Sequence, residues 1–209
     1  MSLRLVSTLT TLLLATSASA QGRLLSADER ADKLVYQDED CGFTIRYPAM
    51  WGIADADLPQ TQFVTEAGFR SDGETPSAAG YNVVCLPAAE GIEEPSDLVT
   101  AVLSFGYREF EALMEEQIGA DVEMLYGGIT TLSGREASFV VYDASLNSFG
   151  SSVPLRMAQF MTVAGGTQFI LTLQSDRSSF VDDLLDLQVM ADTFLIWPQE
   201  ARSNGSLGR

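Results

Sequence analysis

The sequence predicts an α+β protein: an antiparallel β-sheet with helices packed on both faces, an α/β/α sandwich. Segments with alternating apolar and polar residues, which are typical of strands, follow one another across short turns, as in an antiparallel meander. Two further segments carry apolar residues three or four apart, which is typical of helices. Antiparallel hairpins of this kind argue against a doubly wound nucleotide-binding fold, which needs strand–helix–strand crossovers.

The composition along the 209 residues predicts one structured domain with short additions at both ends. Residues 1–20 are expected to be a signal peptide and residues 21–33 a polar leader. A single domain would span residues 34–197, because no linker, repeat or low-complexity block interrupts them. Residues 198–209 start with proline and become rich in glycine and serine, which predicts a flexible tail.

The first three predicted strands are short. Residues 43–47 alternate apolar and polar side chains until Pro48 ends the run. Residues 61–65 form a second candidate, and residues 81–86 form a third that ends at another proline.

Four later segments predict longer strands, of which the last three form an antiparallel meander. They lie at residues 122–131, 135–142, 155–163 and 167–174. Gly127-Gly128 interrupts the first of them, as a bulge or a bend would. Ser133-Gly134 predicts a tight turn, and Gly165-Gly166 predicts a hairpin turn of a type that accepts positive φ.

The first helical segment lies between the third and fourth predicted strands. Ser96 is a candidate N-cap after a proline, and apolar residues recur at helical spacing from Leu98 to Met114. Gly106 lies inside this segment, where it would split or bend the helix.

The second helical segment runs from residue 178 or 179 to Phe194. Its apolar stripe consists of Phe180, Leu184, Leu187, Ala191 and Phe194. Four acids, Asp182, Asp183, Asp186 and Asp192, lie largely off this stripe. We therefore expect the stripe to pack on the sheet and the acids to face water.

The N-terminus has the parts of a secretory signal. Arg4 supplies one positive charge, an apolar run follows, and Ala18-Ser19-Ala20 is a small-x-small cleavage site before Gln21. The alternative, a short membrane anchor, is less favoured because spanning a bilayer takes about 20 apolar residues. With cleavage between Ala20 and Gln21, we expect a periplasmic or secreted protein that has no stable membrane insertion after the signal is removed. No lipid anchor is expected, because glutamine rather than cysteine follows the cleavage site.

Cys41 and Cys85 are the only two cysteines. In an oxidising compartment an even pair predicts one structural disulfide. On the chain-entropy model, closing a loop of this length contributes about 4 kcal/mol to stability. The redox alternative would need a Cys-x-x-Cys motif or a lone activated thiolate, and neither is present in the sequence.

The chain contains no histidine, and 12 Lys+Arg stand against 29 Asp+Glu, for a net charge of -17. The composition excludes catalysis and metal binding through imidazole. It also argues against nucleic acid as a partner, because affinity for phosphates comes from Lys and Arg. The acidic surface would attract a cationic partner, and the alternative is that it serves only solubility or a saline habitat. The sequence shows no Ser-x-x-Lys, Gly-x-Ser-x-Gly, Gly-x-Gly-x-x-Gly or P-loop motif, so we assign no catalytic residue and no cofactor.

Paired carboxylates leave an acid/base or calcium site open. The pairs are Asp55/Asp57, Glu93/Glu94, Glu115/Glu116 and Asp182/Asp183, and Asp38-Glu39-Asp40 could add oxygen ligands. The number of acidic residues does not show that any two of them lie close together in a site. Acids exposed to solvent on the surface are the simpler interpretation. No metal ligand is therefore assigned.

Residues 42–51 (GFTIRYPAMW) resemble the opening strand of the PsbP-like family. Residues 132–137, 166–173 and 180–194 resemble later elements of that family in the same order, so the resemblance spans about residues 41–197. It implies an antiparallel sheet with helices on both faces. The cysteine pair is not part of the family pattern, and the histidines with which some members hold metal are absent. Trp51 is interpreted as a cap on the core, with an exposed docking residue as the alternative.

Together these observations predict an exported, non-enzymatic PsbP-like accessory or interaction protein of the cell envelope or periplasm, whose partner is another envelope protein. An Asp/Glu-dependent or calcium-assisted hydrolase is one alternative, and a small-molecule carrier is another. A pocket with two buried, convergent carboxylates would favour the hydrolase. An apolar pocket of about 300 Å³ or more would favour the carrier.

Overall fold

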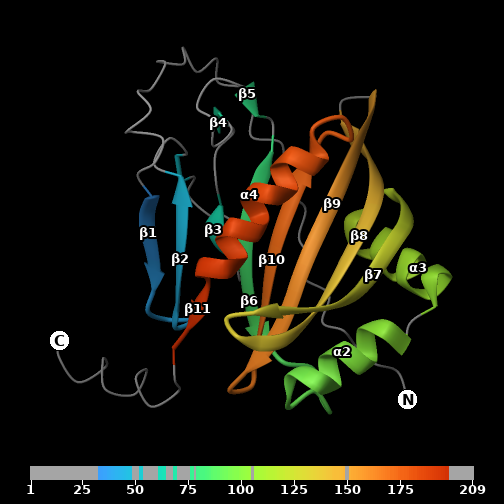
Figure 1. The fold of residues 1–209 in the computed structure, drawn as a ribbon. Helices are drawn as coiled ribbons and strands as arrows, with labels where there is room; N and C mark the ends of the chain where they lie inside the picture. Colours follow the sequence, from blue (N-terminus) through green and yellow to red (C-terminus); the bar gives the residue numbers. More distant parts are fainter. Residues whose placement is uncertain are drawn as a thin grey trace.

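The computed structural model describes residues 33–48, 52–53, 61–64, 68–69, 76–77, 79–104, 106–148 and 151–197. Its architecture is α+β, with three helices packed against antiparallel sheets in the described residues (Figure 1). The strands are β1 (Lys33–Asp38), β2 (Phe43–Pro48), β3 (Thr61–Val64), β4 (Gly68–Phe69), β5 (Pro76–Ser77), β6 (Gly80–Pro87), β7 (Asp121–Leu132), β8 (Arg135–Ser148), β9 (Ser151–Ala164), β10 (Thr167–Ser175) and β11 (Leu195–Ile196). The helices are α2 (Pro95–Ser104), α3 (Tyr107–Ile118) and α4 (Phe180–Thr193).

A six-stranded antiparallel sheet in the order β3-β6-β10-β9-β8-β7 forms the centre of the molecule. Strands β8 to β10 follow one another as the predicted meander, and β7 extends it as the strand before β8. Ser133 (φ 57°) and Gly134 (φ 69°) form the turn between β7 and β8, and Gly165 (φ 57°) and Gly166 (φ 72°) form the turn between β9 and β10. Two consecutive left-handed residues are what a type I′ hairpin requires, so both predicted turns are confirmed.

Helices cover both faces of this sheet. Val140 and Val141 are neighbours in β8, but Val141 belongs to a buried cluster that includes α4, whereas Val140 belongs to a cluster that includes α2 and α3. Because successive strand residues point to opposite faces, the two clusters lie on opposite sides of the sheet. Figure 1 shows α4 crossing one of these faces in front of β10. The predicted α+β layering is confirmed.

The first helical segment is split at Gly106, as the sequence predicts. Gly106 has extended backbone (φ -66°, ψ 154°), and its N–H donates to Glu109 Oε2 at 3.0 Å, which starts α3. Ser96 is not the N-cap of α2, because the helix already begins at Pro95. Asp97 serves the start of α2 instead, since its carboxylate accepts the N–H groups of Glu93 (3.1 Å) and Glu94 (2.9 Å).

A second, three-stranded sheet in the order β1-β2-β11 includes two strands that the sequence analysis does not predict. Lys33 was placed in the leader, yet it is paired with Pro48 at the start of the β1–β2 ladder. The sequence pattern of β1 is weak because the consecutive residues Leu34 and Val35 are both apolar and both exposed. This breaks the alternation expected of a half-buried strand. β11 has only two residues, too few for any periodicity.

Several predictions fall outside the described residues. These are the signal peptide with its cleavage site at Ala20 and Gln21, most of the leader, Trp51, the Asp55/Asp57 pair, and the tail from residue 198. Within the described part of the chain, no helix has the length and apolar character to cross a membrane.

On the sheet face under α2 and α3, five buried polar atoms have no hydrogen-bond partner among the described residues: Asn82 Oδ1, Ser138 Oγ, Tyr142 OH, Gln159 Nε2 and Gln174 Oε1. Tyr142 is fully buried, its ring meets Phe110 edge to face at 5.6 Å, and burial raises the pKa of its hydroxyl. Removing a buried, unpartnered polar group relieves the cost of its desolvation.

Tyr142→Phe is therefore expected to raise the free energy of unfolding by about 1 kcal/mol, measured by urea denaturation. Tyr126→Phe is the matched control, because the Tyr126 side chain is exposed and its hydroxyl can bond to water. It should leave stability unchanged. A loss of stability in Tyr142→Phe would show that the hydroxyl has a partner, such as a bound water.

Candidate functional site

The apolar stripe of α4 packs on the sheet as expected. Phe180, Leu187, Ala191 and Phe194 are buried in the cluster on that side, and Leu184 is packed against its edge. The helix is thereby fixed across the strands, and its remaining faces are available for other contacts.

Two acids of α4 contradict the expectation that all of them face water. Asp183 is 0% exposed and Asp186 is also buried. The Ser175 hydroxyl, at the end of β10, donates to the Asp183 carboxylate. Tyr81 OH donates to the backbone oxygen of Asp183 at 3.0 Å. Asp183 lies in the first turn of the helix, where the helix dipole favours a negative charge, and this compensates in part for its burial.

The outward face of α4 carries aliphatic side chains where the sequence predicts acids. Val181, Leu185 and Val189 are 71%, 57% and 39% exposed. They are four residues apart, so they form one continuous line on the helix, which we call the α4 ridge. Asp182 and Asp192 are exposed on the same helix. The α4 ridge is thus an apolar line on an acidic helix.

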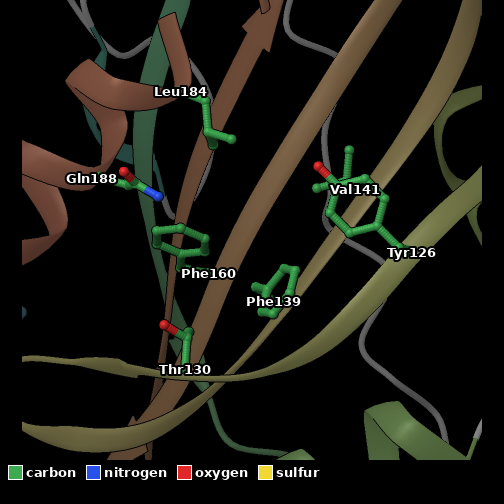
Figure 2. A pocket seen from close by; sticks show the side chains of 7 residues that line it. All are labelled: Tyr126, Thr130, Phe139, Val141, Phe160, Leu184 and Gln188. Atoms are coloured by element: carbon green, nitrogen blue, oxygen red, sulfur yellow. The ribbon is translucent and has the colours of Figure 1, made fainter. Parts of the chain in front are cut away.

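A cavity of about 260 Å³ lies between α4 and the sheet; we call it the α4 cavity. Figure 2 shows the side chains that line it, from β7, β8, β9 and α4. They are Tyr126, Thr130, Phe139, Val141, Phe160, Leu184 and Gln188. The lining is mainly aromatic and aliphatic, with no charged group, so the cavity suits an apolar side chain.

The two glycines of β7 explain why this cavity has an aromatic floor. A Cβ at Gly128 would lie 2.8 Å from Phe139 Cε1, and one at Gly127 would lie 3.0 Å from the Phe139 backbone oxygen. The bare backbone lets the Phe139 ring lie against β7, where it meets Tyr126 edge to face at 6.1 Å and Phe160 at 6.3 Å. The predicted irregularity exists, but the bulge lies between Met124 and Tyr126, just before the glycines.

An ion cluster holds the sheet near the start of α4. Arg156 of β9 makes a bidentate pair with Asp143 of β8, at 2.7 and 3.1 Å, and Arg177 adds a contact at 3.2 Å. The hydrogen bonds to Asp143 raise the pKa of Arg156. The Arg156 guanidinium also lies 5.6 Å from the centre of the Phe180 ring, on the first residue of α4. The cluster therefore helps to position the helix.

Some of the acidic residues named from the sequence take part in local backbone contacts. Glu115 accepts the N–H of Val122 at 3.4 Å, and the backbone N–H groups of Glu93 and Glu94 are held by Asp97. Asp38 accepts the N–H of Cys41 at 2.7 Å and so orders the turn between β1 and β2. Among the described residues, no three or more His, Cys, Asp or Glu side chains gather closely enough to hold a metal ion.

The structure brings the two predicted disulfide partners into one neighbourhood. Cys85 is buried in the cluster beneath α4, and Cys41 packs against the same cluster. Both lie close to Tyr36, whose pKa is raised first by burial and further by Asp38, Cys41 and Cys85. Both cysteines are thiols in this structure, and the disulfide stays a prediction.

Sequence reasoning missed the α4 ridge and the α4 cavity. The ridge did have a signal, because Val181, Leu185 and Val189 repeat at four-residue spacing beside the stripe that was assigned to the core. The cavity had no such signal, because it forms where one aromatic ring lies against a neighbouring strand.

The sheet order, the helices on both faces and the cavity beneath α4 define an α+β protein built around an antiparallel meander. Comparison of the sequence with protein-family models and with curated proteins finds no match. Solved structures do match, and they show that the chain has the Mog1/PsbP-like fold.

Cyanobacterial PsbP (CyanoP) from Synechocystis sp. PCC 6803 matches with a TM-score of 0.54 and 15% identity, over 88% of this chain and 99% of that chain. The Ran-binding protein Mog1p from Saccharomyces cerevisiae matches with a TM-score of 0.55 and 13% identity, over 81% of this chain and 98% of that one. LpqN of Mycobacterium tuberculosis, described as involved in cell envelope biogenesis, matches with a TM-score of 0.44 and 13% identity, over 80% of this chain and 91% of that chain. The fold expected from the family resemblance is confirmed by the first two.

Proposed function

We propose that this chain is an exported, non-enzymatic interaction protein of the cell envelope or periplasm, which binds another protein through the α4 ridge and the α4 cavity. The observation that carries the proposal is the exposed line Val181, Leu185 and Val189 beside an aromatic cavity. Large exposed aliphatic side chains scattered singly are ordinary, but a contiguous apolar surface next to a cavity is typical of interaction sites.

The size of the α4 cavity supports a partner side chain as its occupant. At about 260 Å³ it is smaller than the ~300 Å³ from which small-molecule pockets usually begin. Buried anchor residues that fill such cavities dominate the affinity of many protein interfaces. The cavity therefore favours an interaction protein over a carrier.

No observation favours the hydrolase. The buried carboxylates Asp143, Asp183 and Asp186 are all absent from the lining of the α4 cavity. Asp143 is engaged by two arginines and Asp183 by Ser175, which are contacts that support the fold.

The net charge of the chain indicates the charge expected of its binding partner. The net charge is -17, and no basic residue occurs from Ser178 to Glu200, the segment that contains α4. An acidic surface steers cationic partners toward itself and repels acidic ones, and salt weakens this effect. We therefore infer a basic partner that presents an apolar anchor.

The interaction is tested by placing a photo-crosslinking amino acid at Leu185, with Thr100 on α2 as the control position. Both positions are exposed, but Thr100 is on a helix that packs on the opposite face of the sheet. We expect one discrete crosslinked protein from Leu185 in the periplasmic fraction, less of it at about 1 M salt, and none from Thr100. Equal products from both positions, or none from Leu185, would contradict the proposal.

Export predicts a defined N-terminus. Intact-mass measurement of the protein recovered from its native cells should find a chain that begins at Gln21. This chain has one positive charge fewer than the full sequence, because Arg4 is removed. An Ala18→Leu variant, which fills the small position of the cleavage site, should accumulate as the uncleaved precursor. Recovery of an uncleaved native chain would contradict export by this route.

A further inference from the structure

The end of β7 next to the α4 cavity is an unprotected sheet edge. β7 is the last strand of the six-stranded sheet, and no strand within the described part of the chain pairs with its outer side. Native proteins often protect such edges with lysine, proline or covering elements, because an open edge can accept a strand from another chain.

The first half of this edge is covered by α3. In an antiparallel pair, alternate residues direct their N–H and C=O groups away from the partner strand. Two of these outward N–H groups belong to Val122 and Met124. They donate to Glu115 Oε1 at 3.4 Å and to Glu111 Oε1 at 3.0 Å, both on α3.

The bulge changes which residues face outward in the second half. Met124 is opposite Tyr142, but Tyr126 is opposite Val141, so the alternation shifts by one residue between them. The outward-directed backbone groups after the bulge therefore belong to Gly127, Ile129 and Thr131. Among the described residues, no side chain caps these three N–H groups as Glu111 and Glu115 cap the first two.

The side chains around this open edge suit an added strand. Ile129 is 59% exposed, and Tyr126 and Thr130 of the same strand line the α4 cavity. Residues 126–132 (YGGITTL) contain neither lysine nor proline. A strand paired here would place alternate side chains on the face where the α4 cavity lies.

We propose that the partner binds by strand addition: an extended segment with alternating basic and apolar residues pairs with β7 from Gly127 to Leu132 and turns its apolar side chains toward the α4 cavity. The inference rests on the proposed function and specifies its binding mode. The basic side chains of such a segment would lie on the opposite face of the sheet, where Glu136 of β8 is exposed. A second copy of this chain would carry the same net charge of -17, so electrostatics favours a basic segment over self-pairing.

The test uses the full mature chain and a synthetic heptapeptide that alternates arginine and valine. Amide hydrogen exchange is followed by NMR. Binding should slow exchange at Gly127, Ile129 and Thr131, whereas Val122 and Met124, already bonded to α3, should change little. A peptide with glutamate in place of arginine is the charge control. An arginine–valine peptide that is N-methylated at the alternate residues facing β7 has no N–H to donate to the β7 carbonyl groups, and it should bind about tenfold more weakly for each essential hydrogen bond that it loses.

Variants of the chain provide a second readout. Ile129→Pro removes one outward N–H without removing a bond of the β7–β8 ladder, and Ile129→Thr keeps that N–H while it shortens the side chain. Weaker binding in Ile129→Pro than in Ile129→Thr supports strand addition. If Ile129→Pro does not fold, the N-methylated peptide decides the question.

Three results would overturn the inference. One is peptide binding that leaves exchange at the β7 edge unchanged and survives N-methylation. Another is no binding of the basic peptide at all. The third is protection of the edge by concentration alone, which would identify a second copy as the occupant. None of these affects the crosslinking test at Leu185, so the proposed function can stand when the strand-addition mode fails.

Discussion

Phe194→Ala is expected to lower the free energy of unfolding by about 3–5 kcal/mol, the range for truncating a fully buried aromatic residue. Phe194 is 0% exposed and ends α4. Its ring stacks on Phe43 of β2 at 5.2 Å and meets Phe169 of β10 edge to face at 6.0 Å. Truncation would therefore leave a void where α4, the small sheet and the large sheet meet.

The measurement is chemical denaturation of the wild type and the variant, with the thermal midpoint as a second readout. A chain of this size shifts by about 2–4 °C per kcal/mol, so a drop of roughly 10 °C is expected. Leu195→Ala is the matched control: it removes an aliphatic side chain at the next position, but Leu195 is 58% exposed. Equal losses in the two variants would show that the aromatic cluster does not join the sheets.

The predictions that held are those that depend on local rules. Gly165 and Gly166 were assigned to a hairpin from their tolerance of positive φ, and both have it. Gly106 divides the first helical segment because a glycine in a helix interior is unfavourable. The strands predicted at residues 135–142 and 167–174 are present, although both are buried on each face, with one cluster beneath α4 and the other beneath α2 and α3.

The predictions that failed depend on tertiary contacts. The sequence predicts Asp183 to be a surface acid. In the structure it is buried, and the hydroxyl of Ser175, eight residues earlier, donates to its carboxylate across the turn into α4. Leu34 and Val35 do not alternate, and only their pairing with β2 makes that segment a strand. The α4 cavity exists because the ring of Phe139 lies over Gly128 on another strand. Such contacts depend on the folded chain and not on the periodicity of any one segment.

The outward side of α4 follows from the same helical periodicity as its buried stripe. Val181, Leu185 and Val189 repeat at four-residue spacing on the side away from the sheet, and all three are exposed although they are apolar. The sequence places these residues off the stripe, but only their exposure in the structure identifies them as a surface line.

The second large effect is expected from the cysteines. Export would place Cys41 and Cys85 in an oxidising compartment, where we expect them to form a disulfide, so non-reducing mass spectrometry of the protein from its native cells should find no thiol that alkylates. Reduction should then lower the free energy of unfolding by about 4 kcal/mol, because the loop between the two residues would no longer be closed in the unfolded chain.

The structure supports this pairing by position. Cys41 lies in the turn between β1 and β2, and Cys85 lies in β6 of the large sheet, opposite Phe169. Phe169 in turn meets Phe43, two residues after Cys41, with ring centres 6.5 Å apart. A bond between the sulfurs would join the two sheets covalently beside the aromatic cluster.

The control is the double variant Cys41→Ala/Cys85→Ala, whose stability should not respond to a reductant. Its free energy of unfolding should match that of the reduced wild type to within the cost of the two truncated side chains. Two alkylatable thiols in protein purified from its native compartment would contradict the pairing. In that case Phe43, Phe169 and Phe194 would hold the sheets together through packing alone, and Phe194→Ala should then be as damaging in reducing as in oxidising buffer.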